Sequence, residues 1–305
     1  MKALGHTGAS LLRLYGHIAP TGRGMYRLAR GVVRLYGNEL PRRYVTPWRV
    51  TLELDPQTYP DACMAFGVYE LETMRLIRRV LRPGDHFVDG GANLGYFTSL
   101  AARCVGPTGR VDAFEPEPCN RARLIDHMRH NALLDIVRIH DTALGDASGT
   151  ATLHRRDWIN HGAASLFGGK AARPDEDEAN ATRVRIVRLD EAIDASPRLI
   201  KLDVEGAEVA ALRGGMGLFD QEEPPWVLCE CQPSHLKRAG TSPRELVDAI
   251  RSINSRYDVS VIGDRGAESR AVDVDALTRR GECNLLFRPR PRRQAPIYAS
   301  RGPIP

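Results

Sequence analysis

Apolar positions recur along the chain with two periods, one typical of helices and one of buried strands. Leu71, Met74, Ile77 and Leu81 fall on one helical face, which predicts a helix from Tyr69 to Leu81. Short apolar runs bounded by turn residues predict buried strands, with helical segments between them. The expected strands are 86–89, 111–114, 136–139, 199–202 and 226–229, and the expected helices are 94–104, 116–131 and 243–256. This alternation predicts an α/β fold with a doubly wound, mostly parallel sheet.

Two pairs of further strands depart from this alternation. Residues 150–154 and 183–189 are expected to pair with each other as an excursion, and 257–262 and 284–287 as a closing β-pair. The stretch between the first two strands, residues 156–182, is long and contains four consecutive acids. Loops of that length inside a domain are usually functional or disordered, so we interpret it as a mobile flap near the substrate.

Three parts of the chain differ in composition. Residues 1–50 are interpreted as a basic helical extension, residues 51–290 as the α/β domain, and residues 291–305 as a disordered tail rich in proline and arginine. Within the extension, residues 8–38 follow an amphipathic helical pattern with arginines on one face. Such a helix packs on its own domain or makes a peripheral contact with an anionic membrane. Packing is the commoner use, and a transit peptide is a minor alternative.

Length and charge exclude several classes of protein. The 305 residues contain no run of about 18 apolar residues, so no transmembrane helix is expected. The net charge of +5 comes from the two ends, with nine Lys/Arg and one acid in residues 1–50, and five arginines without an acid in residues 288–305. The part between them is acidic, and an acidic core is a poor groove for nucleic acid. We therefore expect no nucleic-acid partner.

The six cysteines suggest neither a disulfide framework nor a zinc site. They form no C-x-x-C pair, and Cys229 and Cys231 lie two residues apart on an expected buried strand, which is a poor spacing for zinc ligands. Small apolar core residues in a reducing compartment explain them better. We therefore expect a cytoplasmic protein without a bound metal.

The stretch from His86 to Thr98 organises the candidate chemistry. It combines an apolar strand, a glycine turn and the start of a helix, whose first N–H groups can bind a carboxylate. Asp89 places a carboxylate at the carboxyl end of the strand. It would repel a dinucleotide diphosphate, and the glycines at 90, 91 and 95 do not fit the spacing G-x-G-x-x-G. It would attract a cofactor with an ammonium and a sulfonium group, which indicates S-adenosyl-L-methionine.

Further acids follow other strands at the same edge. Glu115 follows the second strand, where a carboxylate can accept both ribose hydroxyls of a nucleoside, although this spacing also suits a dinucleotide. Asp203 and Glu205 follow the strand at 199–202. Acids clustered at strand ends are costly unless a cationic or hydroxyl-rich ligand lies among them. A side chain near Asp141 could accept from an adenine amino group, and a simple turn explains Asp141 equally well.

Six segments occur in an order that matches a known family. They are Tyr69-Glu70, Arg82-Pro83-Gly84-Asp85, Val88-Asp89-Gly90-Gly91-Ala92-Asn93-Leu94-Gly95-Tyr96, Phe114-Glu115-Pro116, Ala143-Leu144-Gly145-Asp146 and Lys201-Leu202-Asp203-Val204-Glu205-Gly206-Ala207-Glu208. Over residues 66–290 the chain resembles the FkbM-type S-adenosylmethionine-dependent methyltransferases. The motifs G-A-N-x-G and D-x-E-G-A-E are specific as a pair, and each alone is weaker. Gly90 stands where the family often has an aliphatic residue.

The resemblance implies the fold, the cofactor and its binding residues. The fold would be the Rossmann-like sheet of class I methyltransferases with a C-terminal antiparallel strand, and the reaction would be methyl transfer, usually to a hydroxyl of a sugar, glycolipid or polyketide-type natural product. Glu115 would hold the ribose of S-adenosyl-L-methionine, and Glu70 would help at its methionine ammonium. The residues placed around the methionine part are Asp89, Gly91, Asn93 and Gly95.

The chemistry of this cofactor sets what the protein must supply. Methyl transfer from a sulfonium is a direct in-line displacement, so it requires alignment of the acceptor but no metal or protein nucleophile. A base must still take the hydroxyl proton, and Asp203 or Glu205 is our candidate. His154 and His161 are weaker candidates, because a lone histidine in a loop is more often solvated.

Two other functional classes stay open. A nucleotide-linked (NAD) oxidoreductase is disfavoured by Asp89 and by the glycine spacing. A non-catalytic binding protein on a methyltransferase fold is disfavoured because a dead site need not keep acids at its strand ends. A nucleic-acid methylase is a weaker alternative still, since the Asn/Asp-Pro-Pro-aromatic signature used on base amines is absent. We therefore expect a small-molecule or glycan acceptor.

Overall fold

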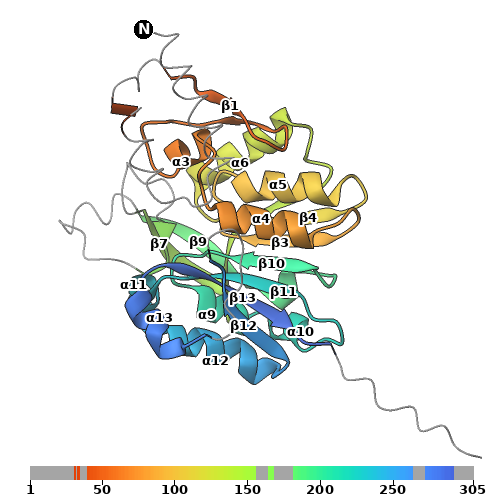
Figure 1. The fold of residues 1–305 in the computed structure, drawn as a ribbon, viewed down its shortest axis with the longest axis vertical. Coiled ribbons are helices and arrows are strands. Elements are labelled where there is room, and N and C mark those ends of the chain that lie inside the picture. Colours follow the sequence, from red (N-terminus) through yellow and green to blue (C-terminus); the bar gives the residue numbers. More distant parts are fainter. Residues whose placement is uncertain are drawn as a thin grey trace, which may run out of the picture.

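The computed structural model describes residues 31, 33, 34, 40–155, 164–167, 181–263 and 272–291. Its centre is a seven-stranded sheet with the order β12-β13-β11-β10-β3-β4-β5 (Figure 1). The strands are β3 (His86–Gly90), β4 (Arg110–Phe114), β5 (Val137–His140), β10 (Leu199–Leu202), β11 (Trp226–Cys231), β12 (Tyr257–Val261) and β13 (Cys283–Pro289). Neighbours from β11 to β5 are parallel, and β13 runs antiparallel to β11 and β12. The predicted fold class, including its antiparallel C-terminal strand, is confirmed.

Alternate residues of each strand pack against helices on opposite faces of this sheet. Phe87 and Leu199 belong to one apolar cluster, and Val88 and Ile200 belong to the other. Because both faces are buried, the strands are largely apolar rather than alternating in the sequence. The helices of the first face are α3 (Asp61–Ala65), α4 (Leu71–Val80), α5 (Tyr96–Val105) and α6 (Pro118–His130). Those of the second face are α8 (Leu189–Ala192), α9 (Glu208–Arg213), α10 (Met216–Phe219), α11 (Pro233–Arg238), α12 (Pro243–Ile253) and α13 (Val274–Arg280) (Figure 1).

Two of the long helices begin where the sequence supplies a cap. At α6 the Glu117 carboxylate accepts the N–H of Asn120 at 2.7 Å, and Pro118 occupies the first helical position. At α12 the Ser242 hydroxyl accepts the N–H of Glu245 at 3.3 Å. These local signals explain why both helices lie within a few residues of their predicted spans.

A smaller, four-stranded sheet has the order β6-β9-β7-β8. It consists of β6 (Thr142–Gly145), β7 (Gly149–Arg155), β8 (Ala164–Ser165) and β9 (Ala181–Arg188). The expected pairing of 150–154 with 183–189 is confirmed, because β7 and β9 are antiparallel neighbours. β6 was not predicted as a strand. It pairs in parallel with β9, and all four of its residues are buried.

A short hairpin precedes the large sheet. β1 (Arg43–Val45) pairs antiparallel with β2 (Thr51–Glu53), so the hairpin crosses the domain boundary expected at residue 50. Tyr44 and Val50 are buried in the same apolar cluster as the first face of the sheet. The described part of the domain therefore starts before residue 51. The other proposed boundaries, the tail at 291–305 and most of the flap at 156–182, lie outside the described residues.

The extension predicted at residues 8–38 also lies almost entirely outside the described residues. Gly31, Val33 and Arg34 are helical. In the described part of the chain, no helix has both the length and the apolar character needed to cross a membrane.

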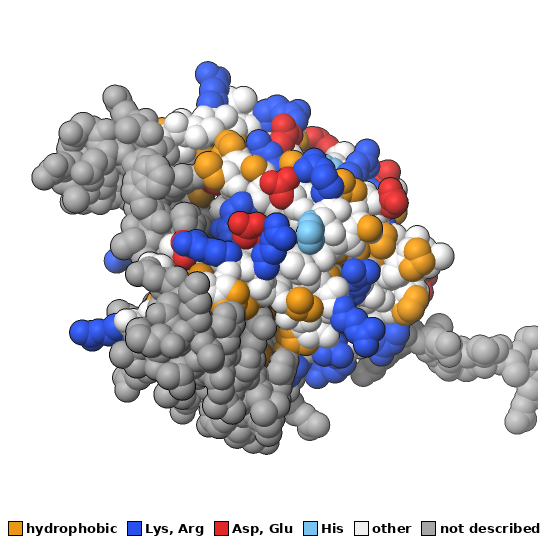
Figure 2. All heavy atoms as spheres, turned by 90° about the horizontal axis from the view of Figure 1, so that it is seen from above, with side chains coloured by type: hydrophobic (Ala, Val, Ile, Leu, Met, Phe, Trp, Pro, Cys, Tyr) orange, Lys and Arg blue, Asp and Glu red, His pale blue; other side chains and the backbone are white. Residues whose placement is uncertain are grey.

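The molecular face that carries β1 and α6 mixes charges of both signs. Figure 2 shows basic and acidic side chains side by side on this face. Two ion pairs tie the hairpin and the following segment to their neighbours, Arg42 to Asp55 at 2.7 Å and Arg123 to Asp61 at 2.5 Å. The six cysteines are all thiols. Cys63, Cys229 and Cys231 are buried, as expected of small core residues, whereas Cys104 and Cys283 are half-buried and Cys119 is exposed.

Candidate functional site

The turn between β3 and α5 is held in an unusual backbone conformation. Gly91 has a φ of 80°, Asn93 of 51° and Gly95 of 91°, all in the left-handed region that favours glycine. A Cβ on Gly91 would overlap the carbonyl oxygen of Asp203, so only glycine lets this turn approach the end of β10. The N–H groups of Gly91 and Ala92 both donate to the Phe114 carbonyl at 3.0 Å. The turn is thus fixed to both neighbouring strands.

Glu115 lies directly after β4 and faces this turn. Its Oε2 accepts the N–H of Asn93 at 2.7 Å, and its Oε1 accepts the N–H of Glu117 at 2.9 Å. Burial raises the pKa of the carboxyl to about 7, although these two N–H donors oppose the shift. A buried carboxylate is therefore fixed at the end of the strand beside the glycine turn.

Asp89 lies beneath the turn and does not line an open space. Its Oδ2 accepts the hydroxyl of Thr98 at 2.7 Å, and its Oδ1 lies 3.7 Å from the Nζ of Lys201. Burial raises the pKa of Asp89, whereas the Lys201 ammonium and the Thr98 hydroxyl lower it. The side chain therefore joins the start of α5 to β10 within the core.

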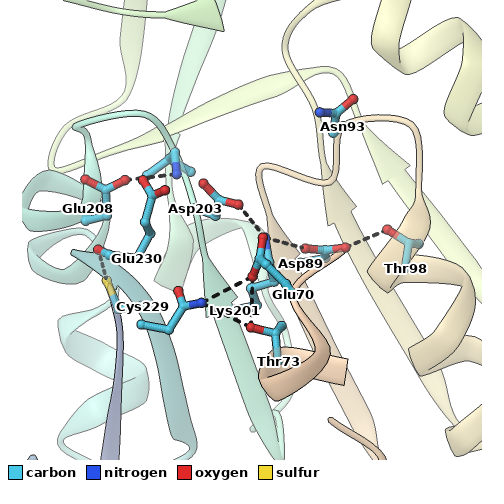
Figure 3. A network of polar contacts seen from close by, with 12 residues as sticks. Glu70, Thr73, Asp89, Asn93, Thr98, Lys201, Asp203, Glu208, Cys229 and Glu230 are labelled. Atoms are coloured by element: carbon cyan, nitrogen blue, oxygen red, sulfur yellow. Dashed lines mark hydrogen bonds and ion pairs between the residues drawn. The ribbon is translucent and has the colours of Figure 1, made fainter. Parts of the chain in front are cut away.

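Lys201 is a buried cation among three acids. Its Nζ lies 3.1 Å from Oδ2 of Asp203 and 5.3 Å from the ring centre of Phe97. Burial lowers the pKa of Lys201, but Asp203, Asp89 and Glu70 together raise it well above its usual value. Figure 3 shows the carboxylates of these three acids gathered around the lysine. Sequence reasoning missed this lysine, although a single cation in an apolar strand is itself a signal.

Glu70 precedes α4 with a φ of 37°, another left-handed residue. Its Oε2 accepts the Thr73 hydroxyl at 2.8 Å and the Asn284 side-chain amide at 3.2 Å. Burial raises the pKa of Glu70 to about 7, and the nearby Asp203 adds to this shift. The residue therefore joins the first-face helix α4 to β13 at the same edge of the sheet.

The loop from Asp203 to Glu208 is organised by its last acid. The Glu208 Oε1 accepts the N–H groups of Val204 at 3.0 Å and Gly206 at 3.2 Å. Burial raises the pKa of Glu208 to about 7. Glu205 has a φ of 55°, and its carbonyl accepts the hydroxyl of Ser165 from β8 at 2.7 Å. The loop thus presents Asp203 and Glu205 in fixed positions.

These residues meet in a cavity of about 240 Å³, which we call the strand-edge cavity. Its lining follows the order of the strands. Gly91, Asn93 and Glu115 form a glycine-turn end beside β3 and β4. At the α11 end, beside β10 and β11, the lining residues are Glu205, Glu230, Gln232 and His235. Because adjacent strands lie about 4.8 Å apart, β4 and β11 are separated by roughly 14 Å across the sheet.

The structure brings most of the predicted site residues into this cavity. Those in its lining are Glu70, Gly91, Asn93, Glu115, Asp203 and Glu205. Asp89 and Gly95 lie behind the lining and shape the turn. Asp141 lies elsewhere: its half-exposed carboxylate pairs with Arg185 at 2.5 Å. The neighbouring residues 142–144, in β6, line the cavity instead.

The lining also holds residues that sequence reasoning did not select. These are Tyr59, Lys201, Glu230, Gln232, His235 and Glu282. Glu230 lies in β11, and burial with several neighbouring acids raises its pKa well above the usual value. The available signal was the polar residues Glu230, Gln232, Ser234 and His235 at the carboxyl end of an apolar strand of the same sheet. Among the described residues, no group of three or more His, Cys, Asp or Glu side chains could hold a metal ion.

Comparison with known proteins points to one family. The model of the methyltransferase FkbM domain matches residues 89–257. A protein named Methyltransferase 1 from Beauveria bassiana is 32% identical over 151 residues, which is 43% of this chain and 59% of that protein. The crystal structure of methyltransferase FkbM from Methylobacillus flagellatus aligns with 16% identity and a TM-score of 0.45, covering 87% of this chain and 71% of that one. A putative rRNA methylase from Clostridium thermocellum aligns with 12% identity and a TM-score of 0.43, covering 72% and 93%.

Proposed function

The chain belongs to the FkbM methyltransferase family, whose methyl donor is S-adenosyl-L-methionine, and we propose that it methylates a hydroxyl oxygen of a sugar, glycolipid or polyketide-type product. The observation that carries the proposal is a single cavity lined by Gly91, Asn93 and Glu115 at one end and by further acids at the other. The first set suits the cofactor, and the second suits a hydroxylated acceptor. The curated relative extends beyond the aligned region, so the acceptor is argued from this cavity alone.

The glycine-turn end fits S-adenosyl-L-methionine. The Oδ1 of Asn93 is buried and has no hydrogen-bond partner among the described residues, so an ammonium or hydroxyl of a ligand would satisfy it. We propose that Asn93 and the turn at Gly91 hold the methionine part together with Glu70, and that Glu115 accepts the ribose hydroxyls. Asp89 and Gly95 act indirectly by shaping the turn. The apolar residues Phe114 and Leu144 line the cavity nearby, and we assign them to the adenine in place of Asp141.

When bound, the cofactor supplies a methyl group on an electrophilic sulfonium. The chain must then position the acceptor hydroxyl, keep water out and accept a proton. Outside its glycine-turn end, the cavity lining contains four further acids, Asp203, Glu205, Glu230 and Glu282. Carboxylates accept hydrogen bonds from hydroxyls and repel anions. We therefore propose an acceptor that is neutral or cationic and rich in hydroxyl groups, rather than a phosphate ester or a nucleic acid.

The rival functions make different demands on the same cavity. A dinucleotide would place a diphosphate near Glu115 and Glu70, which the charge disfavours. A non-catalytic binding protein would not need several buried acids with raised pKa values, which are costly to fold. We also propose a cytoplasmic location, supported by six thiols, and either packing or membrane contact for residues 8–38.

Calorimetry and a labelling assay test this function. S-adenosylhomocysteine should bind with a micromolar dissociation constant, about −8 kcal/mol, and NAD should give no heat. The protein should then transfer label from methyl-labelled S-adenosyl-L-methionine to a member of a panel of glycans, glycolipids and polyketides, with the new methyl located on oxygen by mass spectrometry. NAD binding without S-adenosylhomocysteine binding contradicts the proposal. Methyl transfer to a nitrogen, or to an RNA added to the panel, would contradict the proposed acceptor class, a hydroxyl of a sugar, glycolipid or polyketide-type product.

A further inference from the structure

Among the described residues, His235 supplies the imidazole at the α11 end of the strand-edge cavity. The carboxyl end of β11 runs into α11, which begins at Pro233, so His235 lies in the first turn after the strand. His235 lines the cavity together with Glu230 of β11 and Glu205 of the loop after β10. The strand order places these residues on the side of β10 away from Glu115 and the glycine turn. This is the side left for the acceptor once the cofactor occupies the glycine-turn end.

Two carboxylates face the same nitrogen of this imidazole. The Nδ1 of His235 lies 3.1 Å from the Oε2 of Glu205 and 3.7 Å from the Oε2 of Glu230. The side chains are 19%, 19% and 14% exposed, so the group is largely shielded from water but open to the cavity. A carboxylate beside Nδ1 favours the tautomer with the proton on Nδ1. Nε2 then carries the lone pair that can accept a proton.

The backbone around this group is fixed from two sides. Glu205 adopts a left-handed conformation, and its carbonyl accepts the Ser165 hydroxyl. Next to it, Gly206 packs against the backbone of His235, since a Cβ there would lie 3.0 Å from the carbonyl oxygen of His235. A non-glycine residue in the left-handed region is strained, and such strain concentrates at functional sites. These backbone contacts therefore fix the position of Glu205 relative to His235.

Asp203 is in a different position. Its Oδ2 lies 3.1 Å from the buried ammonium of Lys201, which neutralises the carboxylate. This ion pair ties Asp203 to Lys201 of β10, whereas Glu205 and His235 face each other at the α11 end of the cavity. Of the candidate bases in the cavity, the imidazole has an ordinary pKa closest to neutrality, about 6.5, which suits proton transfer at cellular pH.

We propose that His235 is the general base of the methyl transfer and that Glu205 positions it. The inference rests on the proposed O-methylation. In the step, the acceptor O–H bond breaks and its proton goes to Nε2 of His235, while the oxygen forms a bond to the methyl carbon. The carbon–sulfur bond breaks and its electron pair stays on sulfur. The proton then leaves the imidazolium for solvent. Glu205, which the sequence suggested as a base, acts on the imidazole instead of on the acceptor.

The charges around His235 determine how it titrates. Glu205 faces it from the loop after β10 and Glu230 from β11, and Asp203, Glu208 and Glu282 act in turn on Glu230. The cations on its own helix, Lys237 and Arg238, are exposed. The pKa of Glu230 is raised well above its usual value, so the nearer carboxylate, Glu205, is the group that stabilises the imidazolium. Removing the charge of Glu205 should therefore shift the titration of His235 to lower pH.

The first experiment measures catalysis with the best acceptor of the labelling panel. His235→Gln should lower kcat by about 10²–10⁴-fold and remove the acid limb of the pH–rate profile. The same variant should bind S-adenosylhomocysteine with unchanged affinity in calorimetry. Glu205→Gln should keep part of the activity and move the acid limb to lower pH. His130→Gln, an exposed histidine at the end of α6, is the control and should leave both unchanged.

The second experiment does not depend on activity. The imidazole C–H signal of His235 is followed by NMR against pH in the cofactor-free protein and in Glu205→Gln, and its assignment comes from the spectrum of His235→Asn. The midpoint should fall in Glu205→Gln, with the signal of His130 unmoved. Equal midpoints in the wild type and in Glu205→Gln would show that Glu205 does not position the imidazole, and would overturn the role proposed for Glu205.

The two experiments separate this inference from the proposed function. If wild type methylates no member of the panel on oxygen, the proposed function fails whatever the NMR titration shows. If wild type is active and His235→Gln, folded by circular dichroism, retains kcat, the base is another residue. A loss of cofactor affinity equal to the loss of rate would also overturn the proposal, because His235 would then be a binding residue.

Discussion

The two N–H groups that Glu115 accepts hold its carboxylate at the end of β4 in the cofactor-free protein. The same oxygens are the ones proposed to accept the ribose hydroxyls. Burial has already been imposed on this carboxylate by the fold, so ligand binding need not desolvate it again. Preorganisation of this kind lowers the cost of binding.

Glu115→Ala should weaken the binding of S-adenosylhomocysteine by about 1.5–3 kcal/mol, the usual range for a hydrogen bond to a charged group. Since the pKa of Glu115 is raised to about 7 in the cofactor-free protein, the wild-type affinity should also fall as the pH drops below 7. Calorimetry at pH 8 and pH 6 measures both effects. Asp141→Asn is the control, because that carboxylate pairs with Arg185 outside the cavity. An equal loss in Asp141→Asn would return Asp141 to the cofactor site.

Lys201 is the residue whose loss should most disturb the core at the site. Its ammonium lies between Asp89 and Asp203, and Asp89 is fully buried. Lys201→Met should lower the free energy of unfolding by about 3–5 kcal/mol, because it leaves a buried carboxylate without its counter-charge. Urea unfolding measures this loss. Lys237→Met removes an exposed lysine of α11 and should change the stability by less than about 0.5 kcal/mol. Similar effects of the two substitutions would contradict the assigned role.

At the scale of elements, the close approach of β3 and β10 depends on one glycine. Gly91→Ala would place a Cβ against the Asp203 carbonyl at a φ of 80°, so the turn must move or the strands must separate. We expect a loss of stability of about 1–3 kcal/mol together with loss of S-adenosylhomocysteine binding. Gly149→Ala in β7 is the matched control, because a Cβ there meets no atom within 4 Å. Thermal unfolding measures the stability of the two variants, and calorimetry measures their binding of S-adenosylhomocysteine. Retained ligand binding in Gly91→Ala would show that the turn tolerates displacement.

The elements that the sequence predicted share a local signal. α4 has its apolar face at helical spacing, and α6 and α12 have proline and a capping side chain at their starts. β3, β10 and β11 are largely apolar because both faces of the sheet are buried, and each contains one charged residue close to its carboxyl end. The short helices α3, α11 and α13 were missed, since five to seven residues make at most two turns and show no helical period. β6 was missed because it follows β5 after a single residue.

The site was predictable to the extent that it follows the strand ends. Glu115 and Glu205 could be selected because parallel strands bring their carboxyl ends to one edge, whereas Glu70 and Asn93 were implied by the family resemblance. The partner of each acid was not predictable, because it comes from elsewhere in the fold. Lys201 neutralises Asp203 from within a strand, and Asp141 pairs with Arg185 of the second sheet. His235 follows its strand in a helix too short to recognise from the sequence.

At the scale of the whole molecule, buried acids make stability depend on pH in two opposite directions. Asp112 of the large sheet favours folding at higher pH, and three buried glutamates favour it at lower pH. Asp112 in β4 accepts from His86 at 2.8 Å, from His140 at 2.7 Å and from Arg110 at 2.6 Å. Although burial raises its pKa, these three donors lower it well below the usual range. Stability from Asp112 is therefore present above the pKa of the unfolded chain and is lost as the pH falls through the folded value. Asp112 thus links β3, β4 and β5, and its protonation at low pH should lower the stability of the folded protein.

Glu70, Glu115 and Glu208 have the opposite sign, because the pKa of each is raised from 4.5 to about 7 in the folded protein. Folding takes up protons between these values, so the stability they contribute is present below pH 4.5 and lost as the pH rises through about 7. The free energy of unfolding of the cofactor-free protein should therefore be higher at pH 5 than at pH 7.5. Each group contributes on the order of 1–3 kcal/mol to the difference.

Urea unfolding at pH 5.0, 6.0, 7.0 and 7.5 measures this slope, and Glu208→Gln supplies the matched variant. An amide at this position is neutral at every pH, and its oxygen can still accept the N–H groups of Val204 and Gly206. The slope of stability against pH should become shallower in Glu208→Gln, with the largest gain at pH 7.5. A stability that is flat or rises from pH 5 to 7.5 would show that the three acids are ionised in the folded protein without penalty. The edge of the sheet would then be more hydrated than its burial indicates, and the case for a dry, hydroxyl-binding cavity would weaken with it.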